Sequence, residues 1–171
     1  MDFVPIRINT LRGGQVVSFN IYLHLNDKYI HYIRGGEPFE AQRLKKLKEK
    51  KVKKLFIQLE DETRYRDYLD LSFDDALNSE SLKSVEDRAA VIQGAMESKT
   101  DDLMADTGSA QKYNTAKVGA GRYAEFLMKE DRALANIFAA STEGDKVAQH
   151  GVTVAGLAVK LAQELGINDP K

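Results

Sequence analysis

Residues 16–33, VVSFNIYLHLNDKYIHYI, carry the clearest structural signal in the chain. From Val16 to Leu25 apolar and polar side chains alternate, which is typical of a half-buried strand. Tyr29 to Ile33 alternates in the same way, and Asn26-Asp27 supplies a tight turn between the two segments. The stretch therefore predicts a β-hairpin with one apolar face, formed by Val17, Phe19, Ile21 and Leu23.

Neighbouring segments extend this hairpin into a small domain. Phe3 to Ile8 is predicted to be a strand, and Pro5 marks it as an edge strand or a strand start, because proline cannot donate to a sheet ladder. Pro38 to Lys50 has helical spacing, and a proline suits a first helical turn. Residues 55–59 predict a short strand, and Thr63 to Leu71 a second helix. We expect an α+β domain over residues 1 to about 75.

After Asp75 the strand pattern disappears and helical spacing replaces it. Thr107-Gly108-Ser109 separates a first predicted helix from a helical block expected over residues 110–140. The first helix carries a heptad-like apolar stripe made of Leu82, Val85, Ala89, Ile92, Met96 and Leu103. The second block carries Tyr123, Leu127, Leu134 and Ile137 on one face.

A last helix is expected from about Lys146, after a break at Thr142-Glu143-Gly144. Val154, Ala158, Leu161 and Leu165 fall on one face of it. The sequence thus predicts an α+β fold in three parts: a small domain over 1–75, a helical connector or bundle over 76–145, and a separate helix over 146–171.

Composition excludes several classes of protein. With 43% hydrophobic and 30% charged residues, the 171-residue chain is typical of a soluble globular protein. The net charge of -1 gives no overall field that would attract nucleic acid or an acidic membrane. The chain has no Cys, which excludes disulfides and thiolate metal sites, and no apolar run long enough to span a bilayer. We expect a cytoplasmic protein with neither nucleic acid nor membrane as a partner.

Candidate ligand sites are few. Arg12-Gly13-Gly14 and Arg34-Gly35-Gly36 could bind an anion through arginine and backbone N–H groups, although paired glycines more often form turns. His24 and His31 lie on the two hairpin strands without a third ligand beside them. The basic run between Arg43 and Lys54 is expected to be a solvated helix face and a basic loop. The acids between Glu60 and Asp75 are expected at helix starts and in loops, several of them in capping roles.

Residues 147–168, VAQHGVTVAGLAVKLAQELGIN, resemble the opening helix of the catalytic domain of HD-GYP proteins. In that family a histidine, a small residue and then a valine open the domain, and the helix closes at Leu-Gly-Leu or Leu-Gly-Ile. The matching positions are His150, Gly151, Val154, Ala155, Ala158, Leu161, Ala162, Leu165 and Gly166. The region before it resembles the regulatory module of some members, at residues 4–6, 11, 19–23, 29–35, 44–47 and 52–57.

This resemblance implies a role in cyclic-di-GMP signalling. The family hydrolyses cyclic di-GMP with divalent metal ions such as Fe or Mn, held by a His-Asp pair and further histidines, and it carries a Gly-Tyr-Pro signature. None of these motifs occurs here: there is no His-Asp dipeptide, and the chain has three histidines. A glutamate that joins a third metal in some members is replaced by Lys146. His150 is the one metal-ligand candidate, and only within an intact domain.

The resemblance therefore implies a regulatory N-terminal region that ends at the first helix of an incomplete catalytic domain, holds no cofactor and has no activity by itself. The parent would be a metal-dependent phosphohydrolase, and its catalytic domain would be a partner of this region. Two alternatives remain: a self-contained helical scaffold or adaptor, and a small-ligand-binding module that uses Arg12 and Arg34. A homodimer through the helical region is also expected, although the stripe from Leu82 to Met96 could instead pack within one chain.

Overall fold

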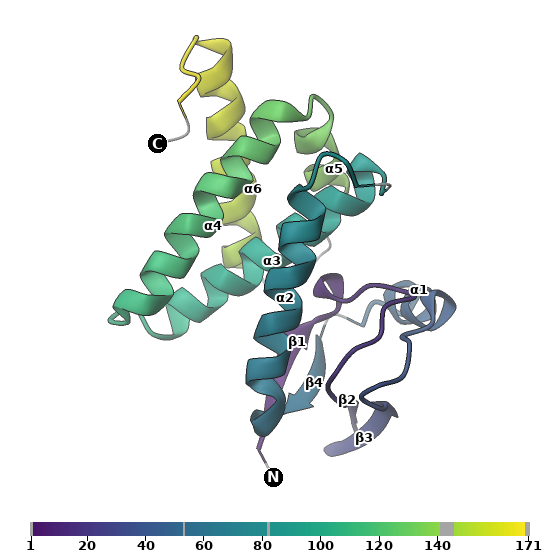
Figure 1. Ribbon diagram of the computed structural model, residues 1–171. Helices are drawn as coiled ribbons and strands as arrows, with labels where there is room; N and C mark the ends of the chain where they lie inside the picture. The colour runs from purple at the N-terminus through teal and green to yellow at the C-terminus, as the bar shows by residue number, and fades with distance from the viewer. Residues whose placement is uncertain (1, 53, 82, 141–145, 170–171) are drawn as a thin grey trace. The chain divides into compact units, whose positions relative to one another are not determined.

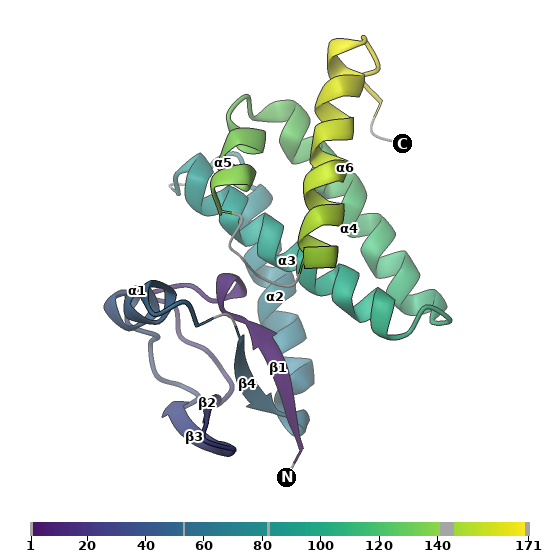
Figure 2. The same cartoon turned by 180° about the vertical axis from the view of Figure 1, so that it is seen from behind.

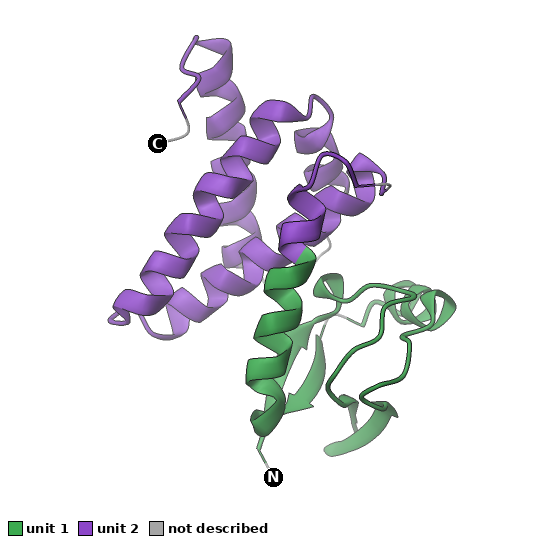
Figure 3. Ribbon diagram, viewed as in Figure 1, with its two compact units in different colours: residues 1–72 green, residues 73–171 purple. Residues whose placement is uncertain are grey.

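A computed structural model of the protein describes residues 2–52, 54–81, 83–140 and 146–169. The chain forms two compact units, residues 1–72 and 73–171 (Figure 3). The expected fold class is confirmed, because a four-stranded sheet comes first and a helical region follows. Among the described residues, every strand lies before residue 59. The expected break at residues 142–144 and the side chain of Leu82 lie outside the described part.

The first unit contains an antiparallel sheet with the strand order β1-β4-β2-β3 (Figure 1). The strands are β1 (Phe3–Arg7), β2 (Ile21–Leu25), β3 (Lys28–Ile33) and β4 (Lys54–Gln58). Pro5 lies in β1, which is an edge strand as predicted. Asn26 and Asp27 adopt φ angles of 49° and 58°, the left-handed conformation that a two-residue hairpin turn needs.

The first hairpin strand is shorter than the period-two pattern predicts. Val17 and Phe19 are buried as expected, yet the regular strand begins only at Ile21. Before it, Val16 forms an isolated bridge with Pro38. Around this bridge the Phe39 N–H donates to the Gln15 carbonyl and the Gly36 N–H to the Val17 carbonyl, so residues 15–17 bond to the segment after β3 and not to β3 itself. The pattern therefore located the buried face correctly and overestimated the length of the strand.

Two helices pack on the core side of this sheet. They are α1 (Ala41–Glu49) and α2 (Glu62–Leu77), with short 3-10 turns at Ile8–Thr10 (η1) and Leu59–Asp61 (η2). α1 begins three residues later than predicted, because Phe39 is fully buried and its backbone bonds to Gln15 instead. α2 extends six residues beyond its predicted end, and the boundary between the units falls within it. The first core joins strands and helices: Ile6, Ile21, Ile33, Leu55, Ile57, Leu44, Leu47, Tyr65 and Leu69.

The second unit is a helical bundle made of the end of α2, α3 (Val85–Ala105), α4 (Ala110–Lys129), α5 (Ala133–Ala140) and α6 (Lys146–Glu164). Ser84 and Ser109 cap α3 and α4, each accepting a hydrogen bond from a backbone N–H three residues on. The helical block expected over residues 110–140 consists of two helices, with Glu130 between them in an extended conformation. No described helix is long and apolar enough to span a membrane.

The central residues of the apolar stripe of α3 are buried inside this bundle. Ala89 and Ile92 are fully buried and Met96 is 6% exposed. They share one core with Leu127 and Ile137, so these residues of the stripe pack within one chain, which the sequence had left as the alternative to a dimer. The same core takes in Phe73 and Ala76 from the end of α2, as well as Tyr123, Phe126 and Val152.

Helix α6 lies against α3, α4 and α5 (Figure 2). It does so through Ala148, Val152 and Gly156, whereas Val154 and Leu161 of the apolar face named from the sequence are exposed. The Tyr123 hydroxyl donates to the Val152 carbonyl at 3.0 Å. A Cβ atom at position 156 would lie 2.6 Å from that hydroxyl. Gly156 is therefore the position that lets α6 approach α4 closely.

Candidate functional site

The outward face of the sheet collects polar and aromatic side chains in the first unit. In an antiparallel ladder, directly paired residues project to the same side. The register pairs Tyr22 with both His31 and Phe56, which extends one face across β3, β2 and β4. The core residues of these strands project to the opposite side. The full outward set is Phe3, Pro5, Arg7, Tyr22, His24, Tyr29, His31, Lys54, Phe56 and Gln58.

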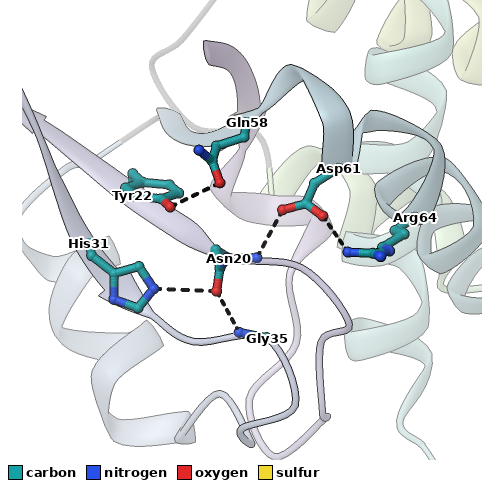
Figure 4. A network of polar contacts seen from close by, with 7 residues as sticks. All are labelled: Asn20, Tyr22, His31, Gly35, Gln58, Asp61 and Arg64. Atoms are coloured by element: carbon teal, nitrogen blue, oxygen red, sulfur yellow. Dashed lines mark hydrogen bonds and ion pairs between the residues drawn. The ribbon is translucent and has the colours of Figure 1, made fainter. Parts of the chain in front are cut away.

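Asn20, just before β2, is the centre of a polar network next to this face (Figure 4). Its side-chain Oδ1 accepts a hydrogen bond from the Gly35 N–H at 3.0 Å and lies 3.4 Å from Nε2 of His31. Its backbone N–H donates to Oδ2 of Asp61 at 3.3 Å. Asn20 thus ties the entry of β2 to the end of β3 and to the start of α2.

Asp61 is the buried anion of the network. Asp61 is 3% exposed, and its Oδ1 lies 2.8 Å from Nη1 of Arg64 (Figure 4). It directly precedes α2, where a negative charge is favourable to the helix dipole. The sequence placed Asp61 among acids expected at helix starts. Its burial, and its bond to the Asn20 backbone across 41 positions, follow only from the tertiary fold.

Aromatic rings cover part of the outward face. Phe3 stacks on Tyr29 with ring centroids 3.8 Å apart and meets Tyr22 edge-on at 5.0 Å. The Tyr22 hydroxyl donates to Oε1 of Gln58 at 3.2 Å. Burial raises the pKa of Tyr22, and the negative charges of Asp61 and Glu60 raise that pKa further. Tyr22 is consequently a neutral hydrogen-bond donor at physiological pH and not an activated nucleophile.

The glycine pairs form turns whose backbone donors are largely used within the fold. The Gly14 N–H donates to the Phe39 carbonyl, and the Gly36 N–H to the Val17 carbonyl, both at 2.7 Å. The Gly35 N–H is bound by Asn20. Of the four glycine N–H groups in the two pairs, three therefore already have acceptors. This agrees with the expectation that paired glycines more often form turns.

The two candidate arginines have different environments. Arg12 is only 9% exposed, and its guanidinium donates to the Ser72 carbonyl at 3.4 Å while its backbone N–H donates to the Tyr68 hydroxyl. Arg34 is exposed. Arg12 therefore has a structural role in fixing its turn to α2. Anion binding by Arg12 and Arg34 stays a prediction.

The basic run shows the expected solvated face over its described residues. α1 buries Leu44 and Leu47 and exposes the residues between and around them. Arg43 reaches Glu40 at 3.5 Å across an exposed pair, a contact that contributes little to stability. Lys53 lies outside the described residues.

The histidines belong to different elements: two lie on the hairpin of the first unit and one on α6 of the second. His24 and His31 are exposed on β2 and β3, and the register pairs each with a tyrosine, so the two are not opposite each other. His150 is exposed on α6 in the other unit. Across the described residues, no three His, Cys, Asp or Glu side chains gather in a group that could hold a metal ion. The described side chains therefore do not fit the metal centre that the resemblance implies, and His150 as a ligand stays a prediction.

The second unit has a pocket of about 160 Å³ beside the end of α2. Nη1 of Arg88 lies 2.6 Å from Oε1 of Glu130, and its Nε donates to the Ala76 carbonyl at 2.7 Å. Arg122, also in the lining, forms an ion pair with Asp74. Through these partners, Arg88 and Arg122 each join separate helices of the unit, which is a structural role. The lining consists of Leu77, Ser79, Arg88, Arg122, Glu125, Phe126, Lys129 and Glu130.

Sequence reasoning missed Asn20 as a structural centre. The alternating pattern had placed it on the polar side of the first hairpin strand, which is typical of an exposed side chain. The one available signal was an Asn directly before a strand, since this residue type often bonds to nearby backbone. The groups that Asn20 joins are 15 and 41 positions away, so no local pattern reveals them.

Comparison with known proteins agrees with the predicted resemblance. No protein-family model matches the chain, and no curated protein matches it. Among solved structures, it is similar to Bd1817, a HDG"Y"P protein from Bdellovibrio bacteriovorus, with a TM-score of 0.80 and 40% sequence identity. The match covers 99% of this chain and 55% of Bd1817. This chain therefore resembles part of an HD-GYP protein over nearly its whole length, and it spans about half of that protein.

Proposed function

We propose that this chain is the N-terminal regulatory region of an HD-GYP-type cyclic-di-GMP phosphodiesterase. The observation that carries the proposal is the 40% identity to Bd1817 along 99% of the chain. The match includes both the α+β unit and the helical unit, in the same order along the sequence. The similarity of the last helix to the family's opening helix supports the same proposal.

The composition of the described residues supports a regulatory rather than a catalytic role. Hydrolysis with bound metal needs several fixed ligands to lower the pKa of a bound water. His150 is exposed, and among the described residues no three His, Cys, Asp or Glu side chains form such a group. In this proposal, the Fe or Mn ions and the hydrolysis belong to the half of the parent protein that this chain does not span, and the cytoplasm is where it acts.

The proposed partners are this catalytic domain and a second copy of the chain. A dimer cannot use the α3 stripe while the bundle is intact, because Ala89, Ile92 and Met96 lie in the core of the unit. Any interface in the helical region must therefore use another surface. The α+β unit would receive the signal, and the helical unit would connect it to the catalytic domain.

The coding sequence after Lys171 tests the proposal most directly. A reading frame that continues into His-Asp and Gly-Tyr-Pro motifs is the expected result. A stop codon immediately after Lys171 would refute the proposal for this gene.

An activity assay gives an independent test. The purified chain, incubated with cyclic di-GMP and Mn²⁺ or Fe²⁺, should leave the nucleotide intact because the chain lacks the His-Asp ligand pair. Hydrolysis that persists through purification and is lost in His150→Ala would show that the chain is itself catalytic. The matched control is His24→Ala, which removes an exposed histidine from the other unit.

A further inference from the structure

The outward face of the sheet has an unusual composition for a surface that meets only water. The solvated face of an antiparallel sheet normally carries polar side chains. Of the ten outward side chains defined above, six carry aromatic or imidazole rings, two are Lys or Arg, and none is Asp or Glu. Aromatic surface concentrated on one exposed face marks a binding surface. The six ring-bearing residues are Phe3, Tyr22, His24, Tyr29, His31 and Phe56.

These rings form one connected cluster across the four strands. Phe3 of β1 stacks on Tyr29 of β3 with 3.8 Å between the ring centroids, although β4 and β2 lie between these strands in the sheet. His24 of β2 lies 4.6 Å from Tyr29 and 5.6 Å from the ring of Phe56 on β4. The rings of both edge strands therefore reach the middle of the face and make a single aromatic surface.

Strand β3 supplies accessible rings to this surface. Tyr29 is 40% exposed, and His31, two residues further along the same strand, is also exposed. Phe3, Tyr22 and Phe56 are half-buried by the other rings of the cluster. Planar bases stack on exposed aromatic rings, and each such contact contributes about 1–3 kcal/mol to binding. Tyr29 and His31 therefore offer a platform on which a planar base can stack.

Two cations lie on the same face beside the rings. The register places Arg7 of β1 directly opposite Lys54 of β4. Like charges in directly opposite positions repel each other, so an anionic group between them would be bound favourably. Lys54 is two residues from Phe56, which is about 7 Å along the strand. Glu60 and Asp61, the acids whose charges act on this face, follow the opposite end of β4.

We infer that the outward face of this sheet binds a nucleotide, with its base stacked on Tyr29 and His31 and its phosphates at Arg7 and Lys54. Ring surface beside two cations is complementary to a ligand that joins a planar base to an anion. The ring of Phe56, 5.2 Å from that of Tyr29, connects the two parts of the site. A protein domain fits this face less well, because the centres of protein interfaces are depleted of Lys. The inference does not depend on the proposed function.

Fluorescence anisotropy of GDP with a fluorescent label on its ribose tests this assignment. We expect saturable binding to the chain and displacement by unlabelled GDP. Guanosine lacks the anion and inorganic pyrophosphate lacks the base, so each should displace the probe at least about tenfold more weakly than GDP. The absence of saturable binding at protein concentrations up to about 1 mM overturns the assignment. Displacement by pyrophosphate as strong as by GDP also overturns it, since anion binding alone would explain that result.

Substitutions locate the bound probe. Tyr29→Ala and Lys54→Gln should each weaken binding of labelled GDP about tenfold or more, since each removes one of the two kinds of contact. Their matched controls in the second unit are Tyr113→Ala and Lys129→Gln, which remove an exposed tyrosine and an exposed lysine and should bind the probe like the wild type. Unchanged affinity in either Tyr29→Ala or Lys54→Gln, or an equal loss in its control, overturns the assignment.

A second ring variant keeps the test decisive if circular dichroism shows that Tyr29→Ala does not fold. His31 is exposed, so His31→Ala removes one ring of the platform with little effect on folding. This variant should weaken binding of labelled GDP by about tenfold. Wild-type affinity in His31→Ala would then overturn the assignment.

Discussion

Gly156 provides the sharpest test of how the helical unit is held together. The position lies where α6 meets Tyr123 and Leu134, and an added Cβ would lie 2.6 Å from the Tyr123 hydroxyl and 3.2 Å from Leu134 Cδ1. The Tyr123 side chain cannot move away easily, because the residue is 2% exposed and its hydroxyl is bound to the Val152 carbonyl. Gly156→Ala must therefore push α6 outward or break this hydrogen bond.

The size of the effect follows from opposing terms. Alanine in a helix interior is favoured over glycine by about 1 kcal/mol. Overpacking a core costs about 1–3 kcal/mol, and loss of a buried hydrogen bond about 1 kcal/mol more. We expect Gly156→Ala to lower the free energy of unfolding by about 1–3 kcal/mol. For a unit of this size, each kcal/mol corresponds to roughly 4–8 °C in the midpoint of thermal unfolding.

Gly151→Ala is the matched control on the same helix. Gly151 is exposed, and nothing lies within 4 Å of its ideal Cβ, so alanine there should stabilise the protein by up to about 1 kcal/mol. Thermal and urea unfolding followed by circular dichroism would measure both variants. On a Tyr123→Phe background, Gly156→Ala should cost less, because the atom it meets is gone. If Gly156→Ala is as stable as Gly151→Ala, the inference that α6 closely approaches Tyr123 at Gly156 is wrong.

Two further predictions concern pH and the network of Figure 4. Burial raises the pKa of Tyr123, with Glu97 adding to the effect, whereas an unfolded tyrosine ionises near 10.0. The stability that the neutral Tyr123 hydroxyl contributes is thus complete below pH 10 and is lost as the pH rises above it. Between pH 9 and 11 the wild-type unfolding midpoint should therefore fall more steeply than that of Tyr123→Phe, and parallel slopes would contradict this. Asn20→Ala should lower the free energy of unfolding, measured in urea, by about 1–2 kcal/mol, because it leaves the Gly35 N–H without its acceptor. The control His31→Ala, at the exposed 3.4 Å contact with Asn20, should change that free energy by less than about 0.5 kcal/mol. Equal costs for the two variants would show that the bond to Gly35 is not what stabilises the network.

Local patterns determined the kind of fold. Period-two alternation identified the hairpin and its buried side, Pro5 identified an edge strand, and helical spacing identified the region after the sheet. These features depend on neighbours along the chain, so they can be read from a sequence. Element ends were less accurate: Phe39 made α1 start late, and the helical block expected over residues 110–140 gave no sign of the division at Glu130. Both ends depend on the packing or conformation of single residues.

The order of strands and the choice of buried helix face were decided by tertiary structure. β4 inserts between β1 and β2, a pairing of segments far apart in sequence that no local period encodes. For α6, the sequence identified one apolar face, made of Val154, Ala158, Leu161 and Leu165. The bundle buries Val152 and Gly156 instead, because a glycine admits Tyr123 at a distance that a larger residue would prevent.

The sequence by itself determined the α+β class, the resemblance of the chain to an HD-GYP protein and the lack of a His-Asp pair, since these depend on residue types and their spacing. Only the tertiary structure decided that Arg12 is held by Ser72, that Asp61 is buried and bound by the Asn20 backbone, and that α6 packs through Val152 and Gly156. The physical reason is that burial depends on which distant segments meet. A hydrophobic or polar side chain specifies that it prefers a partner, and the fold specifies which partner it receives.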